Sequence, residues 1–328
     1  MRKHCKTCHT ILHRWGRTST GKQRWKCPKC SSPNSLKRSD VSLKYRTALF
    51  ISWLCGNASL TEICTSEDIS RRTLNYWFKS FWNHQPIPCF PETLANTYLV
   101  VDAIYLEGHH HCVLIGRSGN GHIVWEFAEQ ETFEAWFSFF SKLPKPKAVI
   151  CDGHGGLFSG VKTVYPQLPI QRCLIHIHRL AIVKLTRNPR NIAGKELLSL
   201  VSALHGLRTS QDQTAWTIAF WSWSKKWEAF LKERTWGISP TGQKYWWYTH
   251  RNIRALKRTL EQALPHLFTF LNIDGVPRTT NLVEGGINSR LADLLRRHRG
   301  APLEHKKVLV AHYLNSRNGV EKPTRNCT

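Results

Sequence analysis

The chain has 328 residues, enough for more than one domain with a sizeable hydrophobic core. Hydrophobic residues make up 41% and charged residues 21%, but 47 Lys and Arg against 22 Asp and Glu give a net charge of +25. No stretch is apolar for long enough to span a membrane, and the N-terminus lacks the apolar core of a signal peptide, so we expect a cytoplasmic protein without a membrane partner. The charge indicates nucleic acid as the partner rather than a merely basic surface.

Two Cys-x2-Cys pairs stand at the start of the chain. Cys5 and Cys8 form the first pair, Cys27 and Cys30 form the second, and eighteen residues separate the pairs. Four thiolates at this spacing can complete a tetrahedral Zn²⁺ site. We therefore predict a zinc-ribbon domain over residues 1–36, in which the metal replaces the core that so short a segment cannot build.

Three helices are predicted after the ribbon, within residues 37–84. Apolar residues in 41–55 follow a helical stripe, Ser59 can cap a short second helix, and Ser70 can cap a third helix over RRTLNYWFKSFW. Such a trio resembles a helix-turn-helix, whose last helix enters the major groove; a plain helical bundle is the alternative. The residues that the third helix would present to DNA are Arg71, Arg72, Asn75 and Lys79.

The sequence changes character after a proline-rich linker at 85–93. Apolar runs and turn residues predict three strands, an amphipathic helix and a fourth strand, in that order, at 97–107, 111–118, 122–129, 131–143 and 147–152. This order is that of a ribonuclease-H-like α/β fold, in which the first and fourth strands lie side by side. Asp102 in the first strand and Asp152 at the end of the fourth would then be neighbours.

Two neighbouring carboxylates have a chemical use. They cannot both stay ionised in a site of low dielectric constant without a cation. Two Mg²⁺ ions bridged by carboxylates clamp the attacking and leaving oxygens of a phosphoryl displacement. Because a single Asp in a strand is more often structural, a third carboxylate would strengthen the hypothesis.

Glu284 is the candidate for that third carboxylate, in the segment PRTTNLVEGGINSRLADLLRRHRG. Asn281, Glu284 and Asn288 fall on one face of the predicted helix, although Gly285 and Gly286 each cost it roughly 1 kcal/mol of helix propensity. Such glycines suit a backbone that approaches another element or a ligand closely. Basic residues suited to DNA phosphates follow: Arg290, Arg296, Arg297, His298 and Arg299.

A long insertion rich in helix-like sequence and tryptophan separates Asp152 from Glu284. We expect most of its tryptophans to lie in a helical core. Trp246 and Trp247, between Tyr245 and Tyr248, are the exceptions, because four adjacent aromatic residues cannot all face inward. These two can stack on unpaired bases at a nicked or flipped DNA end.

The stretch RCLIHIHR contains a Cys-x2-His pair, Cys173 and His176. Taken alone, it fits a structural zinc site, a nucleophile and its base, or one part of a metal-dependent active site. A protease-type dyad would also need an orienting residue and an oxyanion hole, and the sequence indicates neither.

Together these motifs resemble the Mutator-type DDE transposases of bacterial insertion sequences, which share a ribonuclease-H-like core. The matching segments are LVVDAIY, ICDGHGGL, RCLIH and TTNLVEGGINSRL, and the resemblance spans residues 95 to 300. It implies that Asp102, Asp152 and Glu284 are a catalytic triad that coordinates Mg²⁺ or Mn²⁺. The supporting residues would be Cys173, His176, Asn281 and Asn288, with the Cys-x2-His pair bracing the site or the scissile strand rather than holding zinc.

The resemblance also implies a function. The enzyme would bind the terminal inverted repeats of its element as double-stranded DNA, cleave the element ends with activated water, and join the 3′-OH ends to target DNA. A homodimer or larger synaptic complex at the bacterial nucleoid is expected, because two element ends must be paired.

The expected domain order places the catalytic core around an all-α insertion. It comprises a zinc ribbon (1–36), a helix-turn-helix-like region (37–84), the first part of the core (95–180), the Trp-rich all-α insertion (181–272), and the last part of the core with a basic tail (273–328). Two other functions remain open: a non-catalytic DNA-binding regulator derived from a transposase, and a ribonuclease-H-like nuclease without strand transfer.

Overall fold

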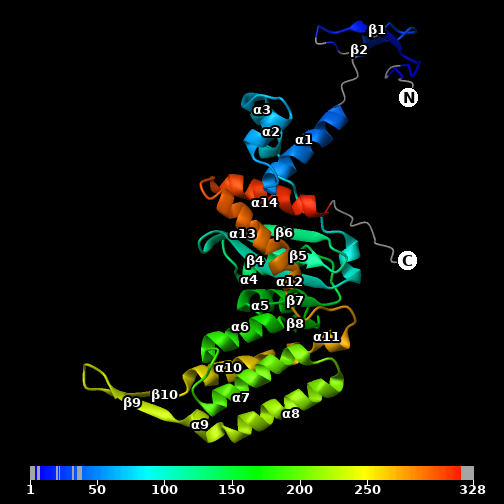
Figure 1. Ribbon diagram of the computed structural model, residues 1–328. Helices are drawn as coiled ribbons and strands as arrows, with labels where there is room; N and C mark the ends of the chain where they lie inside the picture. Colours follow the sequence, from blue (N-terminus) through cyan, green and yellow to red (C-terminus); the bar gives the residue numbers. More distant parts are fainter. Residues whose placement is uncertain are drawn as a thin grey trace. The chain divides into compact units, whose positions relative to one another are not determined.

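The computed structural model describes residues 4–318 apart from 6–7, 20, 22, 32 and 35–38. The chain divides into two units, Met1–Lys79 and Ser80–Thr328 (Figure 1). Across the described residues, no helix is both long and apolar enough to cross a membrane. The predicted basic tail falls largely on 319–328, outside the described residues.

The first unit contains a small antiparallel sheet and three helices. The second helix begins with a capping box, in which the Ser59 hydroxyl accepts from Glu62 N at 3.1 Å and the Glu62 carboxylate accepts from Ser59 N at 2.6 Å. Ser70 caps the third helix as predicted, since its hydroxyl accepts from Thr73 N at 3.1 Å. The elements are β1 (His13–Arg17), β2 (Gln23–Lys26), β3 (Pro33–Asn34), α1 (Ser39–Leu54), α2 (Leu60–Ser66) and α3 (Arg71–Trp82).

A five-stranded mixed sheet forms the centre of the second unit, with the strand order β6-β5-β4-β7-β8 (Figure 1). Its first three strands in sequence are antiparallel, whereas β7 and β8 run parallel to β4. The expected pairing of the first and fourth strands is present, because Val100 of β4 lies opposite Ile150 of β7. The strands are β4 (Leu99–Glu107), β5 (His110–Ser118), β6 (Ile123–Ala128), β7 (Val149–Cys151) and β8 (Ile170–Arg172).

One face of this sheet is covered by aromatic side chains of a helix pair. Leu99 and Val101 of β4 pack in a common core with Trp136 and Phe140, which are fully buried. Side chains alternate along a strand, so Asp102 lies on the opposite face from Leu99 and Val101. The helices on the first face are α4 (Phe133–Ser141) and α5 (Gly155–Val164), and a short 3₁₀ turn, η1 (Glu92–Asn96), precedes β4.

The C-terminal segment packs on the other face of the sheet. It contains a five-residue π-helical turn, Glu284–Asn288, between two α-helical stretches. The last helix is fixed to the sheet edge, because the Asn318 amide bonds Ile123 N at 2.7 Å and Ile123 O at 2.8 Å. The elements are α12 (Asn281–Val283), the π turn η4 (Glu284–Asn288), α13 (Ser289–Arg297) and α14 (Leu303–Asn318).

A helical region with its own hydrophobic core fills most of the insertion. Trp216 and Trp223 lie in this core, and their indole N–H groups donate to Leu200 O at 2.7 Å and Ala193 O at 3.0 Å. The expectation that most tryptophans here are core residues therefore holds for these two. The elements are α6 (Leu174–Leu185), α7 (Ile192–Ala203), η2 (Leu204–Gly206), α8 (Ser210–Lys226), α9 (Glu228–Lys232), α10 (Arg251–Ala263), η3 (Leu264–His266) and α11 (Thr269–Asn272).

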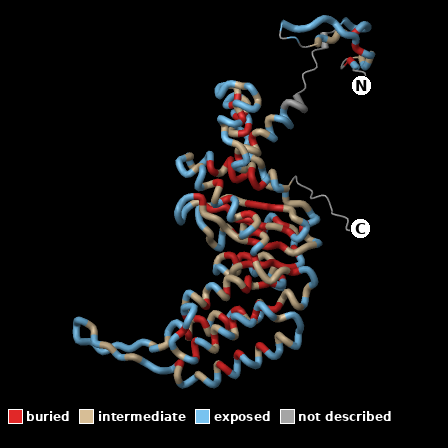
Figure 2. The backbone as a smooth tube through the Cα atoms, in the orientation of Figure 1, coloured by how far each residue is buried: buried red, intermediate tan, exposed pale blue. Residues whose placement is uncertain are grey.

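The insertion is not all α-helical, contrary to our expectation. Strands β9 (Arg234–Ile238) and β10 (Lys244–Tyr248) form an antiparallel hairpin that extends away from the helices (Figure 1). Its surface is mostly exposed, in contrast to the buried strands of the central sheet (Figure 2). The run of aromatic residues, in which every second side chain points to the same face, favours a strand over a helix.

A buried glutamine joins the sheet to the end of the insertion. Gln171 of β8 is fully buried, its amide nitrogen donates to Leu267 O at 3.0 Å, and its amide oxygen accepts from Phe270 N at 3.0 Å. The same amide nitrogen also donates to Arg172 O at 2.7 Å. One side chain therefore satisfies several buried backbone groups between elements far apart in the sequence.

The substitution Gln171→Leu should therefore destabilise the second unit. The apolar side chain leaves backbone groups of Leu267 and Phe270 without their partners, at a cost of about 2–4 kcal/mol. Urea unfolding followed by tryptophan fluorescence measures the loss. Gln211→Leu, at an exposed position of α8, serves as the control and should change the unfolding free energy by less than about 0.5 kcal/mol. Equal effects of the two substitutions would contradict the role given to Gln171.

Candidate active site and metal centres

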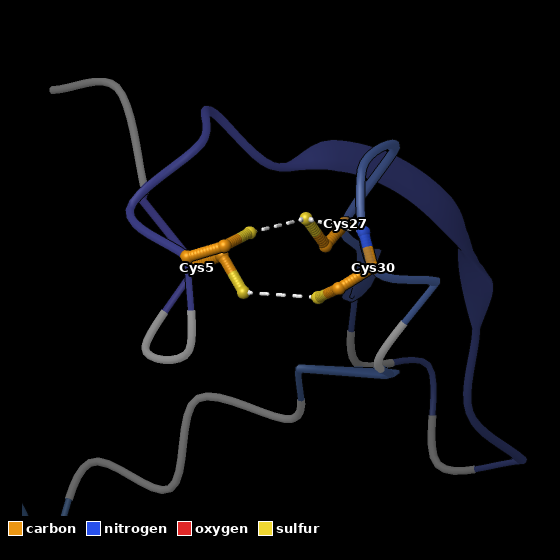
Figure 3. A group of neighbouring side chains, drawn as sticks. Cys5, Cys27 and Cys30 are labelled. Atoms are coloured by element: carbon orange, nitrogen blue, oxygen red, sulfur yellow. Dashed lines mark hydrogen bonds between the residues drawn. The ribbon is translucent and has the colours of Figure 1, made fainter.

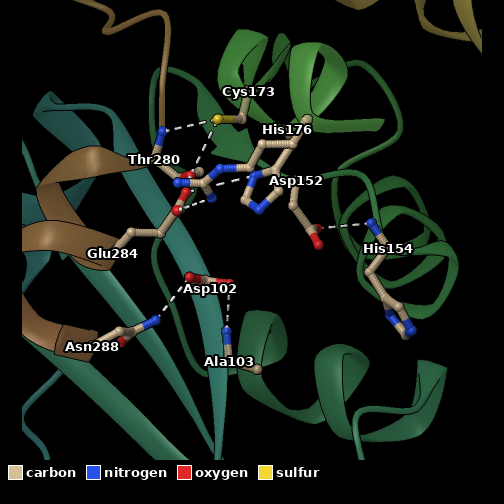
Figure 4. Close-up of polar contacts among 10 residues, drawn as sticks. Asp102, Ala103, Asp152, His154, Cys173, His176, Thr280, Glu284 and Asn288 are labelled. Carbon is tan, nitrogen blue, oxygen red and sulfur yellow. Dashed lines mark hydrogen bonds and ion pairs between the residues drawn. The ribbon is translucent and has the colours of Figure 1, made fainter. Parts of the chain in front are cut away.

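Three acidic side chains converge on one space beside the central sheet (Figure 4). Asp102 extends from β4, and Asp152 follows directly after β7. Because Val100 and Ile150 are paired, each aspartate lies two residues beyond a matched position of two parallel strands. Glu284 comes from the first residue of the π turn on the other side of this space. Residues that lie 50 to 182 positions apart in the sequence are thus assembled by strand pairing and one helix.

The π turn also places Asn288 at the site. Its amide nitrogen donates to Asp102 Oδ2 at 2.7 Å, while its amide oxygen is buried without a hydrogen-bond partner among the described residues. Asn281, by contrast, is exposed at the start of α12, and no described hydrogen bond joins it to the three carboxylates. The expected grouping of both amides with Glu284 therefore holds only for Asn288.

One of the two glycines in the turn has a packing reason. A Cβ on Gly286 would lie 3.0 Å from Nη1 of Arg117, whose guanidinium donates to Leu282 O at 2.8 Å. Gly285, in contrast, faces open space. The close approach expected for the Gly-Gly pair is therefore a contact between Gly286 and a β5 side chain.

Burial and mutual repulsion shape the electrostatics of the site. Burial, together with the negative charges of Asp152 and Glu284, raises the pKa of Asp102 to about 7 against the hydrogen bond from Ala103 N at 3.0 Å. Asp152 Oδ1 accepts from His154 N at 2.8 Å. Hydrogen bonds from backbone and side-chain groups thus stabilise the two aspartates beside each other.

Glu284 is held by a different set of partners (Figure 4). Its Oε2 pairs with Arg179 Nη1 at 2.7 Å, and its Oε1 lies 3.5 Å from His176 Nδ1 and accepts a hydrogen bond from the Thr280 hydroxyl. Burial opposes ionisation, but the hydrogen bonds from Thr280 and Arg179 outweigh it and lower the pKa of Glu284. Glu284 is accordingly an anion held by residues of α6 and the segment before α12.

The Cys-x2-His pair lies directly beside Glu284. The Cys173 thiol is buried at the start of α6 and accepts from Thr280 N at 3.4 Å and from the Thr280 hydroxyl at 3.3 Å. Burial alone would raise the pKa of Cys173, but the His176 imidazole and Thr280 lower it; the neighbouring thiol in turn raises the pKa of His176. The structure thus brings this pair to the same site as the carboxylates.

Two clusters of potential metal ligands occur among the described residues. One is the four-cysteine cluster at the N-terminus, and the other is Cys173, His176 and Glu284; within each, the ligand atoms all lie within 4.8 Å of one another. The oxygens of Asp102, Asp152 and Glu284 do not all approach one another this closely in the described structure. Glu284 is grouped instead with the sulfur and nitrogen donors.

The four-cysteine cluster is compact. Cys5 Sγ lies 3.5 Å from Cys30 Sγ, and Cys8 Sγ lies 3.3 Å from Cys27 Sγ, with all four thiols free of disulfides (Figure 3). Such sulfur separations are those of ligands around one tetrahedral ion. The predicted grouping of the two Cys-x2-Cys pairs is present, and its donor set is the one Zn²⁺ prefers.

Three residues of the site were missed by the sequence interpretation. Arg179 lies one helical turn after His176 in the stretch RCLIHIHR, so the spacing of the two residues could have predicted that Arg179 lies at the site. Thr280 has no such signal, because its role depends on the fold. Glu131 is a further carboxylate near Asp152: burial raises its pKa, and its Oε1 lies 3.4 Å from His154 Nδ1.

The glycine after Asp152 does not leave open space. Gly153 has a φ of +85°, a conformation that favours glycine, and a Cβ there would lie 1.8 Å from Cζ of Arg172. The guanidinium of Arg172 fills the space beside Gly153. Its Nε is buried and has no hydrogen-bond partner among the described residues.

The residues predicted to contact DNA lie on exposed surfaces. On α3 they are Arg71, Arg72, Asn75 and Lys79, and around the end of α13 they are Arg290, Arg296, Arg297, His298 and Arg299, of which all but the half-buried His298 are exposed. Asp293 pairs with Arg296 at 3.2 Å and Arg297 at 3.5 Å, which offsets part of that basic charge. In the hairpin, Trp246 and Trp247 are 40% and 37% exposed, so the expectation that they face outward is correct.

Comparison with known proteins agrees with the motifs. Residues 96–234 match the model of the Mutator family of transposases, a segment that contains Asp102, Asp152, Cys173 and His176. The chain matches none of the curated proteins with which it was compared. The family match confirms the resemblance inferred from the sequence: residues 96–234 form a segment similar to the Mutator family of transposases.

Proposed function

We propose that this protein is a DDE transposase with a ribonuclease-H-like core, which cleaves the ends of its element and joins them to target DNA. The observation that supports the proposal most strongly is the convergence of Asp102, Asp152 and Glu284 on one space, two of them within the Mutator-family domain. The strand order and the parallel pairing of β4 with β7 are those expected of such a core.

The donor set fits a hard divalent cation. Asp102, Asp152 and Glu284 offer carboxylate oxygens, and the partnerless buried amide oxygen of Asn288 lies beside Asp102. A positive ion would also relieve the repulsion that raises the pKa of Asp102. These residues would hold Mg²⁺ or Mn²⁺, which supplies Lewis-acid activation of the water and stabilises the negative charge that develops on the phosphoryl group.

The residues around the carboxylates orient the reaction. Asn288 and Ala103 N fix the Asp102 carboxylate, and His154 N fixes that of Asp152, so the two oxygen donors keep their directions while DNA enters. Arg179, with its side chain 58% exposed, can leave Glu284 for a DNA phosphate when a cation takes its place. Cys173 and His176 brace Glu284 from the side of α6.

The two chemical steps are displacements at phosphorus. In cleavage, a water oxygen bonds to the phosphorus as the bond to O3′ breaks; the water loses a proton to solvent, and the 3′ oxygen gains one. In joining, this 3′-OH attacks a target phosphodiester, the bond from phosphorus to the target O3′ breaks, and the proton passes from the attacking to the leaving oxygen. No phosphodiester energy is lost in the second step, so no nucleotide cofactor is required.

DNA recognition is assigned to the basic and aromatic surfaces outside the site. The helices of the first unit would act as a helix-turn-helix, with the exposed polar residues of α3 in the major groove. The basic end of α13 would bind phosphates, and Trp246 and Trp247 would stack on unpaired bases at the cleaved end. A homodimer or larger complex would pair the two element ends. The net charge of +25 supports extensive phosphate contact.

Loss of either of two carboxylates tests the triad. The substrate is a labelled duplex made from the DNA that flanks the reading frame. Asp152→Asn and Glu284→Gln should each lower its Mg²⁺-dependent nicking on the order of 10³-fold, because each removes a charge on which transition-state stabilisation depends. Matched controls are Asp274→Asn and Glu228→Gln, which change exposed carboxylates and should keep activity within about twofold.

Three outcomes separate the functions. Nicking that survives both substitutions contradicts the triad. Nicking without transfer of the labelled 3′ end to a second duplex indicates a nuclease. DNA binding without any nicking by the unmodified protein indicates a regulator.

The four-cysteine cluster predicts a separate zinc dependence. Cys27→Ser should remove about one zinc ion per chain and unfold the ribbon, because so small a segment depends on its metal for stability. Elemental mass spectrometry measures the zinc, and proteolysis measures the loss of structure near the N-terminus. Cys89→Ser, which changes an exposed free cysteine of the second unit, should alter neither. An unchanged zinc content in Cys27→Ser would exclude the predicted ribbon site.

A further inference from the structure

We propose that Cys173, His176 and Glu284 form a second zinc site, which shares Glu284 with the proposed Mg²⁺ site and makes the transposase sensitive to inhibition by zinc. The three ligand atoms lie within 4.8 Å of one another, and His176 Nδ1 is 3.5 Å from Glu284 Oε1. Two donors on one tetrahedral zinc ion lie roughly 3.3–3.8 Å apart, given zinc–ligand bonds of about 2.0–2.3 Å. The observed separation is therefore that of two ligands of one ion.

The chemistry of the donors selects the metal. Sulfur and imidazole nitrogen are preferred by Zn²⁺ and disfavoured by Mg²⁺, which takes oxygen ligands. Three protein ligands with a fourth position open to water are the pattern of accessible zinc sites. Cys173 and His176 are also spaced as Cys-x2-His on the first turn of α6, so one helix end carries two of the three ligands.

The contacts around the three ligands hold them in orientations suited to a metal ion. His176 Nδ1 is buried and lies 3.5 Å from Glu284 Oε1, so the two atoms face each other across a space that one metal ion can occupy. Thr280 N and its hydroxyl donate to the Cys173 sulfur at 3.4 and 3.3 Å, as donors around zinc thiolates do. Arg179 holds Oε2 of Glu284 and leaves Oε1 turned toward His176.

An ion can reach this site from solvent. The Cys173 thiol is buried, but the side chains of His176 and Glu284 are 30% and 17% exposed. In Figure 4 these two side chains point toward the same space as Asp102 and Asp152. Zinc can therefore arrive by the route that the substrate and Mg²⁺ use.

Sharing Glu284 has a consequence, which rests on the proposed DDE function. A carboxylate oxygen bound to zinc beside Cys173 and His176 is withdrawn from Asp102 and Asp152. Zinc also binds mixed nitrogen and oxygen sites far more tightly than Mg²⁺, so low zinc competes with much higher Mg²⁺. The zinc-bound protein would keep its fold and its DNA contacts while it loses cleavage.

Metal stoichiometry tests the site without any activity. After equilibrium dialysis against Zn²⁺, the full-length protein should hold about two zinc ions per chain, one at the four-cysteine cluster and one here. Cys173→Ser and His176→Ala should each hold about one. Cys112→Ala, which changes another fully buried thiol, is the matched control and should hold two. His176→Ala removes a half-buried side chain, so it reports on the site even where loss of the buried thiol disturbs folding.

A single zinc ion in the unmodified protein, or two ions retained in both ligand variants, would overturn the proposed site. Co²⁺ provides a second readout, since a thiolate ligand gives it an intense near-ultraviolet absorption. The part of this absorption that remains in Cys27→Ser should vanish when Cys173→Ser is added. Its persistence in the double variant would likewise overturn the site.

Nicking assays test the competition. With Mg²⁺ fixed, zinc added beyond the first equivalent should lower nicking by the unmodified protein on the order of tenfold or more, since zinc outcompetes Mg²⁺ for a shared ligand. In His176→Ala, added zinc should lower the nicking rate by less than about twofold, whatever the rate of this variant without zinc. Two bound zinc ions with undiminished nicking would overturn the competition. A protein that never nicks refutes the proposed function instead, and the zinc stoichiometry alone then decides whether the site exists.

Discussion

The structure of this site is constrained by the cost of placing three carboxylates close together in a partly buried space. Asp102 is half-buried near two other carboxylates, and its raised pKa of about 7, which burial causes first and their charges second, expresses the cost. The structure meets that cost by giving each carboxylate its own donor: Asn288 for Asp102, His154 N for Asp152 and Arg179 for Glu284. A bound cation would take over part of the role of these donors.

The same constraint explains why the third carboxylate comes from an irregular helix. A π turn is less stable than α-helix and occurs often at functional sites, where it changes which side chains share a face. Here it brings Glu284 and Asn288 to the site while Gly286 leaves room for Arg117 of β5. The Arg117 guanidinium donates to Leu282 O, so the strand that pairs with β4 also fixes the helix that carries Glu284.

Much of this arrangement was predictable from the sequence, because its signals are local. The caps at Ser59 and Ser70, the order of the first four core strands and the pairing that brings Asp102 to Asp152 depend on period and turn residues. The three-residue strand β8 and the π turn were missed, because a short strand and an extra residue in a helix leave no distinct hydrophobic period. The hairpin β9–β10 was missed because the aromatic run of β10, KYWWY, does not alternate polar with apolar residues. Contacts such as those of Arg172 with Gly153 depend on tertiary packing alone.

The position of Glu284 between two sets of donors means that the fold determines which metal binds on each side of it. On one side it faces the oxygens of two aspartates, and on the other it lies 3.5 Å from an imidazole next to a buried thiol. A hard cation gains most from the first side and a thiophilic cation from the second, yet the carboxylate can serve each fully only by turning away from the other. Oxygen ligands alone would bind Mg²⁺ and zinc at the same place, and the competition would then depend on affinity alone. With sulfur and nitrogen donors set apart, zinc must draw Glu284 aside, so it inhibits by changing the geometry of the triad and not only by occupying it.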